Sequence, residues 1–185
     1  MVAAERDPII VVPYDPEWPA LFARQAAELR AALGPVALRI DHIGSTSVPG
    51  LAAKPIIDVQ VAVASFEPLD AYRAPLEGLG YVFHAENAER TKRYFREPPG
   101  MRRTHIHVRR AGSFSEQFAL LFRDYLRSHA DETDAYARLK YELAGRYRND
   151  REGYVAAKQP YIYQVIARAD AWAQETGWLP GPSDA

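Results

Sequence analysis

The segment at residues 40–63 constrains the fold of this chain more than any other. It reads IDHIGSTSVPGLAAKPIIDVQVAV and continues the apolar run VALRI at residues 36–40. Short apolar runs rich in valine and isoleucine predict strands, so we expect one strand before residue 41 and a second at residues 55–63. The Gly, Ser, Thr and Pro residues between them cannot continue either strand. Residues 44–54 are therefore predicted to be a loop that joins two strands.

The composition of this loop is suited to binding phosphate. A glycine lets the backbone approach a ligand, neighbouring N–H groups and hydroxyls can hydrogen-bond phosphate oxygens, and a lysine adds positive charge. The alternative is a tight connector without a ligand, because Gly-Ser pairs recur by chance. The candidate phosphate-binding residues in the loop are Gly44, Ser45, Thr46, Ser47 and Lys54.

Asp58 is the strongest single candidate for chemistry. Alternate side chains of a strand point to opposite faces, so Asp58 shares its face with Gln60 while the valines face the core. A carboxylate in so apolar a run is costly unless it meets a cation or a hydrogen-bond donor. We expect Asp58 to be the catalytic and metal-binding residue. Hydrogen bonding to its own loop is the alternative.

Two histidines form a second polar pattern, in the predicted strand at residues 103–110. His105 and His107 are two positions apart, which places both imidazoles on one face. Such a pair can hold a metal ion, hydrogen-bond a phosphate or act as acid and base. A polar face on an edge strand is the alternative. Of the other histidines, only His42 is expected near the site, where it would contact site residues and not the ligand.

Basic residues gather between positions 90 and 110, although the formal net charge of the whole chain is only −1. Arginine forks match the oxygens of phosphate or carboxylate, so we expect an anionic ligand beside these strands. Arg93 and Arg103 are the phosphate-binding candidates in this segment. A solvated edge hairpin, protected from aggregation by its charge, is the alternative.

Length and composition predict one ordinary globular domain. The chain has 185 residues, 48% of them hydrophobic, and no cysteine, which excludes disulfides, thiolate nucleophiles and cysteine zinc sites. No apolar run reaches membrane-spanning length, and the N-terminal residues do not resemble a signal peptide. We expect a cytoplasmic protein without a membrane or clear nucleic-acid partner, with a homodimer as one option for assembly.

The remaining pattern predicts an α+β fold in one domain at residues 1–180. A strand-rich core at 9–112 is followed by helices at 113–176, where apolar residues recur at helical spacing. Charged residues on these helices, among them Asp124, Lys140 and Lys158, could reach the site, and Asp124 could replace a missing acid. Surface or interhelical ion pairs are the alternative and the more common role of such residues. We expect the tail after Gly177 to fray. The other predicted elements are an edge strand at 9–13, helices at 15–33 and 68–79, and strands at 81–84, 92–97 and 103–110.

Five motifs in this order resemble the GrpB family. They are PYDPEWPALF at residues 13–22, HIGSTSVPGLAAKPIIDV at 42–59, RTHIHV at 103–108, LLFRDYLR at 120–127 and YARLKYELA at 136–144. The resemblance extends over residues 11–169. Proteins of this family, some of them fused to dephospho-CoA kinase, are placed by similarity in the nucleotidyltransferase superfamily. The resemblance therefore implies a small mixed β-sheet flanked by helices.

The same resemblance implies a nucleoside triphosphate and a divalent metal. In that superfamily a Gly-Ser turn contacts the triphosphate, and acids at i and i+2 of the next strand, with a third from a later strand, hold two metal ions. Gly44-Ser45 and Asp58 match these positions, but Gln60 replaces the second acid and the later strand carries histidines. The implied cofactor is Mg²⁺ or Mn²⁺. Asp58 with two imidazoles would suit manganese, zinc or iron better.

Three functions are compatible with these residues. The first is transfer of a nucleotidyl group from a nucleoside triphosphate to a small acceptor, with Ser45 and Lys54 on the phosphates and Asp58 on the metal. The second is a catalytically degenerate nucleotide-binding or regulatory module. The third is a transition-metal enzyme built on Asp58 and the histidine pair, acting on a small molecule. Each requires a nucleotide or another anionic small molecule as ligand.

Overall fold

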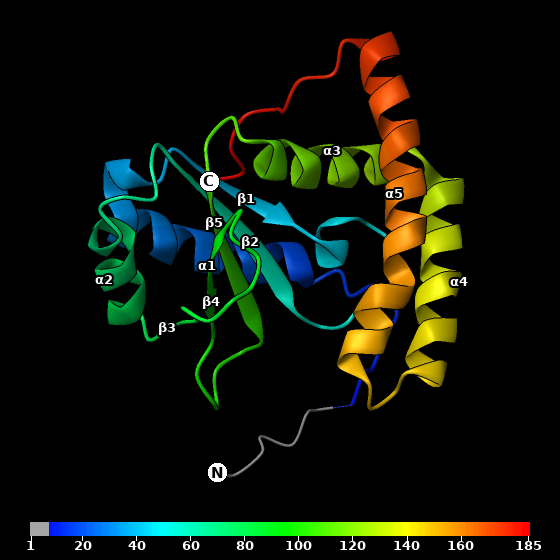
Figure 1. The fold of residues 1–185 in the computed structure, drawn as a ribbon, viewed down its shortest axis with the longest axis horizontal. Coiled ribbons are helices and arrows are strands. Elements are labelled where there is room, and N and C mark those ends of the chain that lie inside the picture. Colours follow the sequence, from blue (N-terminus) through cyan, green and yellow to red (C-terminus); the bar gives the residue numbers. More distant parts are fainter. Residues whose placement is uncertain (1–7) are drawn as a thin grey trace.

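A five-stranded mixed sheet forms the centre of the protein, seen in a computed structural model that describes residues 8–185 (Figure 1). Residues 1–7, where the predicted domain begins, lie outside the described residues. The strand order is β1-β2-β5-β4-β3; β2 and β5 pair in parallel, and the other neighbours are antiparallel. The strands are β1 (Arg39–Ile43), β2 (Ile57–Val63), β3 (Val82–Phe83), β4 (Arg93–Arg96) and β5 (Thr104–Arg110).

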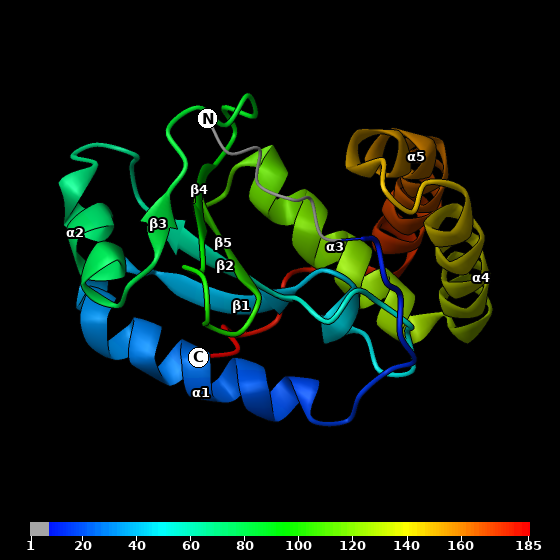
Figure 2. The ribbon, with the colours of Figure 1, turned by 90° about the horizontal axis from the view of Figure 1, so that it is seen from below.

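Helices cover both faces of this sheet. Helices α1 (Trp18–Leu33) and α2 (Asp70–Gly78) lie on one face, where the largest apolar cluster forms between them and the strands. Helix α3 (Phe114–Ser128) crosses the other face, and α4 (Ala130–Arg146) and α5 (Arg151–Thr176) pack beside it (Figure 2). The predicted α+β fold, with a small mixed sheet and a helical last third, is confirmed.

The helical third packs on the loop that joins β1 and β2. Val48 and Leu51 of this loop are buried in an apolar cluster with Tyr125 of α3, Tyr136 of α4 and Val165 of α5. Burial of these side chains fixes the helices relative to the sheet by excluding apolar surface from water. The loop is therefore held between the sheet edge and three helices.

The predicted edge strand at residues 9–13 is wrong. The described chain forms only an isolated bridge there, in which Val12 and Ala53 exchange backbone hydrogen bonds of 2.9 Å. Pro8 and Pro13 flank the segment, and proline has no N–H to extend a ladder. The other strands and helices predicted from the pattern are confirmed, with shifts of a few residues at their ends.

The prediction of a frayed tail after Gly177 is also wrong. The tail returns to β1, where the backbone N–H groups of Ile40 and His42 donate to Ser183 Oγ and Asp184 Oδ2, each at 2.9 Å (Figure 1). The Asp184 carboxylate also pairs with Arg123 Nη1 at 2.9 Å. Because β1 is an edge strand, its outer backbone groups need partners, and the tail supplies them. No helix among residues 8–185 is long and apolar enough to cross a membrane.

Candidate functional site

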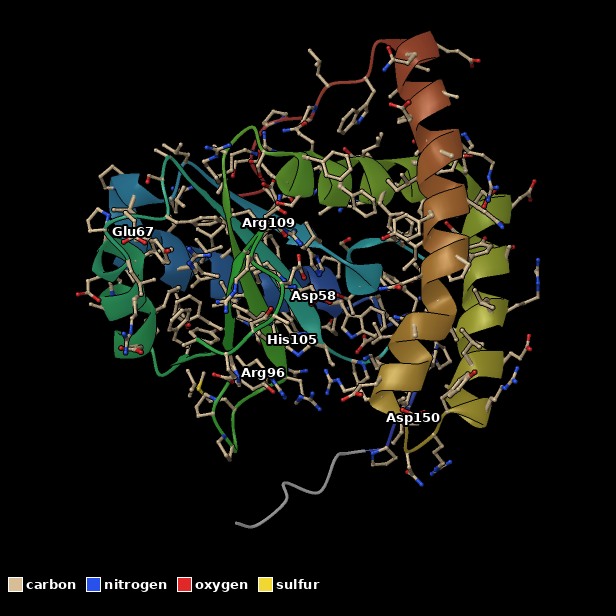
Figure 3. All side chains as sticks on the ribbon, viewed as in Figure 1. Asp58, Glu67, Arg96, His105, Arg109 and Asp150 are labelled. Atoms are coloured by element: carbon tan, nitrogen blue, oxygen red, sulfur yellow. The ribbon has the colours of Figure 1, made fainter. Side chains whose placement is uncertain are left out.

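Asp58, His105 and His107 form a cluster on the face of the sheet that lies toward the last three helices. The parallel register of β2 and β5 sets Asp58 opposite His105 (Figure 3). Asp58 Oδ1 lies 3.2 Å from His105 Nδ1 and 3.0 Å from His107 Nε2. The ligand atoms of all three side chains lie within 4.8 Å of one another. The structure thus brings the three expected metal ligands together from the neighbouring strands β2 and β5.

The protonation of this cluster follows from burial and hydrogen bonding. Burial opposes ionisation of Asp58, but hydrogen bonds from His105 and His107 outweigh it and hold the pKa of the Asp58 carboxyl well below its usual range. Burial lowers the pKa of His107 to about 4, despite the attraction of Asp58. An ionised carboxylate beside a neutral imidazole is the state in which both groups can bind a metal ion.

Gly44 allows the loop to pass directly over Asp58. Its φ is +71°, a conformation that favours glycine, and a Cβ atom at this position would lie 2.6 Å from Asp58 Oδ2. The chain then forms a 3₁₀ turn at Ser45–Ser47. Gly44 is therefore required both by the backbone conformation and by the closeness of the carboxylate.

The hydroxyls of the loop serve mainly to hold its shape. Thr46 Oγ1 donates to the Ile56 carbonyl at 3.1 Å and lies 3.0 Å from His42 Nε2. Ser47 Oγ donates to the Gly44 carbonyl at 2.5 Å. His42 stacks on Phe22, and burial lowers its pKa to about 4. His42 supports the loop from behind, as predicted.

A cavity of about 610 Å³ lies between this cluster and the helices α4 and α5. Five basic side chains line it, whereas Asp58 is the sole carboxylate among its described lining residues. This imbalance makes the cavity suited to a ligand with several negative charges. The basic residues are Lys54, Lys92, Lys140, Arg151 and Lys158, and the aromatic ones are Tyr94, Phe122, Tyr136 and Tyr154.

Lys140 is the most unusual of these basic residues. It is 2% exposed, and among residues 8–185 its ammonium group has no hydrogen-bond partner. Its Nζ atom lies 4.5 Å from the ring centroid of Tyr136. Burial, with repulsion from Lys158 and Lys54, lowers the pKa of Lys140 to about 6. An anion in the cavity would give this group the partner that the described side chains do not provide.

Two further lysines share one tyrosine ring. The Nζ atoms of Lys158 and Lys54 lie 4.5 Å and 5.4 Å from the ring centroid of Tyr154. Burial lowers the pKa of each lysine to about 8. The ring faces attract the ammonium groups but carry no net charge, so they do not neutralise Lys54 and Lys158. Lys92, by contrast, pairs with Glu89 at 2.7 Å.

The structure brings together most, but not all, of the residues expected at the site. Three expected residues, Ser47, Arg93 and Arg103, do not line the cavity. Arg93 lies over the Phe66 ring, with its guanidinium carbon 4.3 Å from the centroid, and Arg103 pairs with Glu97 at 2.7 Å. The expected residues that do line it are Gly44, Ser45, Thr46, Lys54, Asp58, His105 and His107.

The side chains of Gln60, which stands in place of the second acid, and Asp124, which could have replaced it, do not reach the Asp58 cluster. Gln60 is fully buried; its Oε1 accepts from Arg109 Nη1 at 2.5 Å, and its Nε2 lies 3.5 Å from the Glu116 carbonyl oxygen. Asp124 pairs with Arg123 at 2.7 Å and accepts from Trp178 Nε1 at 3.2 Å. Asp124 therefore has the ion-pair role that was the alternative to a place in the site, whereas Lys140 and Lys158 do line the cavity.

Several residues that line the cavity from the helices and from the region of β4 were not among the predicted site residues. A signal was nevertheless present, because a Tyr-x-x-x-Lys pattern occurs at Tyr136–Lys140 and again at Tyr154–Lys158. Residues four positions apart lie on one face of a helix. Among the lining residues that were not predicted are Lys92, Tyr94, Tyr136, Arg151 and Tyr154.

The mixed sheet with helices on both faces defines a nucleotidyltransferase-like fold. A cytoplasmic RNA terminal U-transferase superposes with a TM-score of 0.52 over 73% of this chain and 42% of its own, at 18% identity. This likeness concerns the fold alone. The GrpB protein family matches residues 8–168, and the chain belongs to the GrpB family.

Relatives in this family are similar over most of the chain. The crystal structure of GrpB from Enterococcus faecalis superposes with a TM-score of 0.80 at 35% identity, covering 88% of this chain and 99% of that one. A UPF0157 protein of Pseudomonas aeruginosa is 44% identical over 170 residues, which are 90% of this chain and 69% of that protein. A dephospho-CoA kinase of Mycolicibacterium paratuberculosis is 37% identical, but the chain spans only 49% of its length.

Proposed function

We propose that this protein binds a nucleoside triphosphate together with a divalent metal and transfers the nucleotidyl group to a small acceptor. One observation carries the proposal: a single cavity holds the Asp58 cluster and five basic side chains. A triphosphate is multiply anionic and would neutralise this charge. The nucleotidyltransferase-like fold supports the same choice of ligand.

The residues of the cluster fit one transition-metal ion better than a pair of magnesium ions. One carboxylate and two imidazoles form a donor set typical of manganese, zinc or iron, whereas Mg²⁺ prefers oxygen ligands. Gln60 is occupied by Arg109 and provides no second carboxylate. A metal held by Asp58, His105 and His107 would supply a Lewis acid that polarises a phosphoryl oxygen.

The other cavity residues would bind the nucleotide itself. Lys54, Lys140 and Lys158 would pair with the phosphates, and the backbone at Gly44-Ser45 would approach them closely because no side chain intervenes. Tyr94 and Tyr154 offer ring faces for the base. In the transfer, an acceptor oxygen bonds to the α-phosphorus, the bond to the β-phosphate oxygen breaks, pyrophosphate leaves and the acceptor proton passes to solvent.

A metal-dependent phosphoesterase is the second candidate, and the donor set of one carboxylate and two imidazoles, which suits a single transition-metal ion, favours it. In this reaction, water rather than an acceptor attacks a phosphorus atom. The same lysines would bind the substrate phosphate, so the two candidates share a ligand class. They differ in their products.

Phosphorus NMR of a reaction mixture tests the proposal. The full chain is incubated with each of the four common ribonucleoside triphosphates, Mn²⁺ or Zn²⁺, and a pool of small hydroxylated and phosphorylated acceptors. We expect pyrophosphate and a new phosphodiester signal, both lost in Asp58→Asn and retained in Asp134→Asn, which changes an exposed carboxylate that does not line the cavity. Inorganic phosphate alone would favour the phosphoesterase, and no reaction with any triphosphate would contradict nucleotidyl transfer.

A further inference from the structure

A second, smaller cavity adjoins the main one and has no role in the function proposed so far. It has a volume of about 270 Å³, and its wall includes Lys54, Ile56 and Arg151, which also line the main cavity. The two cavities therefore meet at a shared wall. Ile56 lies two positions before Asp58 in the chain, so this wall borders the metal-binding cluster. We call the smaller one the outer cavity.

The charged residues among the described lining of the outer cavity are basic. Lys54, Arg103 and Arg151 line it, together with Pro8, Ile9 and Ile10. Arg103 pairs with Glu97, but Arg151 forms no ion pair with a residue in the range 8–185. Repulsion from Arg96 and Arg103 adds to the effect of burial and lowers the pKa of Arg151. Nitrogen-bearing side chains gather in this region, between the labelled Arg96 and the start of α5 near Asp150 (Figure 3).

We propose that the outer cavity binds a phosphate group of the acceptor, so that the acceptor is a phosphorylated small molecule. This inference rests on the proposed function. The guanidinium group of Arg151 provides planar donors that match phosphate oxygens, and Lys54 adds a charge from the side of the main cavity. Arg103, which pairs with Glu97, adds positive charge to the same wall. An acceptor anchored there by its phosphate would extend past Ile56 toward the α-phosphate of the nucleotide. Holding both reactants in adjoining cavities supplies the proximity that a transfer reaction requires.

Residues that line only one of the two cavities allow each cavity to be tested separately. Ile10 lines only the outer cavity and is 51% exposed, so Ile10→Glu places a negative charge there without disturbing the core, and Ile10→Gln is its uncharged match. Arg103→Gln removes a donor from the same cavity. Lys158→Gln affects only the main cavity.

The experiment is calorimetric titration of the full chain with two probes. Inorganic triphosphate reports on the main cavity, and inorganic phosphate, added in the presence of saturating triphosphate, reports on the outer one. We expect the phosphate affinity to fall at least tenfold in Ile10→Glu and Arg103→Gln and to persist in Ile10→Gln. Lys158→Gln should weaken triphosphate binding and leave phosphate binding intact.

The possible results separate the two proposals. If triphosphate binds but phosphate shows no second binding event, or binds equally to Ile10→Glu and the parent, the outer-cavity inference is overturned and the proposed function stands. If triphosphate does not bind, the proposed function fails. Phosphate binding that is still weakened by Ile10→Glu would then support the outer cavity as an independent phosphate site.

Discussion

Asp58 Oδ1 lies 3.0 Å from His107 Nε2, although the two residues are 49 positions apart in the chain. The contact depends on the parallel pairing of β2 and β5, the sole parallel pair among the described strands. His105, which lies directly opposite Asp58 in the register, reaches the same oxygen. A shift of register by one residue would turn both imidazoles to the opposite face of the sheet and leave Asp58 without them.

Removal of either imidazole should impair metal binding. We expect His105→Ala and His107→Ala each to lower the affinity for Zn²⁺ or Mn²⁺ by tenfold or more, since each deletes one ligand of three. Calorimetric titration with the metal alone measures the effect. His84→Ala is the matched control, because His84 pairs with Glu86 outside the cavity. Equal affinity in all three variants would show that the cluster holds no metal.

Gly44→Ala should disrupt the cluster through steric contact. The new Cβ would lie 2.6 Å from Asp58 Oδ2, so the carboxylate must move away from the histidines. Gly50→Ala is the matched control: its φ is +79°, but nothing lies within 4 Å of its Cβ. We expect each variant to lose about 1–3 kcal/mol of unfolding free energy from backbone strain. Metal binding should fall only in Gly44→Ala; its retention there would contradict this account.

Gln60→Asp should not create a second metal site. The side chain at this position is buried against Arg109, and a new carboxylate would pair with that guanidinium. We expect one equivalent of metal per chain in both proteins, determined by elemental analysis after dialysis against Mn²⁺. Two equivalents in the variant would mean that position 60 faces the cluster after all.

Lys140→Met should stabilise the ligand-free protein. Burial lowers the pKa of Lys140 from 10.5 to about 6, so the folded state disfavours the ammonium form. The parent therefore loses stability as pH falls from about 10 to 6, and the advantage of the variant should grow over this range and then level off. We expect a gain of about 1–3 kcal/mol at neutral pH, as found when buried charges are replaced by apolar groups. Urea denaturation at several pH values measures it.

Ligand binding provides the control for this variant. With saturating inorganic triphosphate, the parent should gain more stability than Lys140→Met, because the ligand pairs with the ammonium group in the parent alone. If both proteins gained equally, Lys140 would not contact the phosphates.

Local patterns predicted the strands and the candidate residues, but not how they meet. The apolar run around Asp58 and the spacing of His105 and His107 are visible in the sequence because strand periodicity is local. Their contact depends on a register between distant strands. The same limit applies to Arg93: alternation shows that Arg93 and Tyr94 face opposite sides, but only the assembled sheet shows that Tyr94 lines the cavity.

The features that could not be predicted from the sequence also depend on packing between segments that are far apart in the chain. The tail was expected to fray, yet Ser183 and Asp184 bind the open edge of β1. The spacing of Tyr136 with Lys140 and of Tyr154 with Lys158 is visible in the sequence, but by itself it predicts a shared helix face and not a site. Each pairing of tyrosine with lysine matters only because α4 and α5 lie above the Asp58 cluster.

The most direct test of the proposed nucleotide site is calorimetric titration with ATP, GTP, CTP and UTP, with and without Mn²⁺, of the parent, Asp58→Asn and Lys158→Gln. The account predicts that at least one nucleotide binds the parent more tightly with Mn²⁺. Asp58→Asn should abolish this metal dependence, and Lys158→Gln should weaken binding with or without metal. Failure of all four nucleotides to bind the parent under either condition would contradict the account.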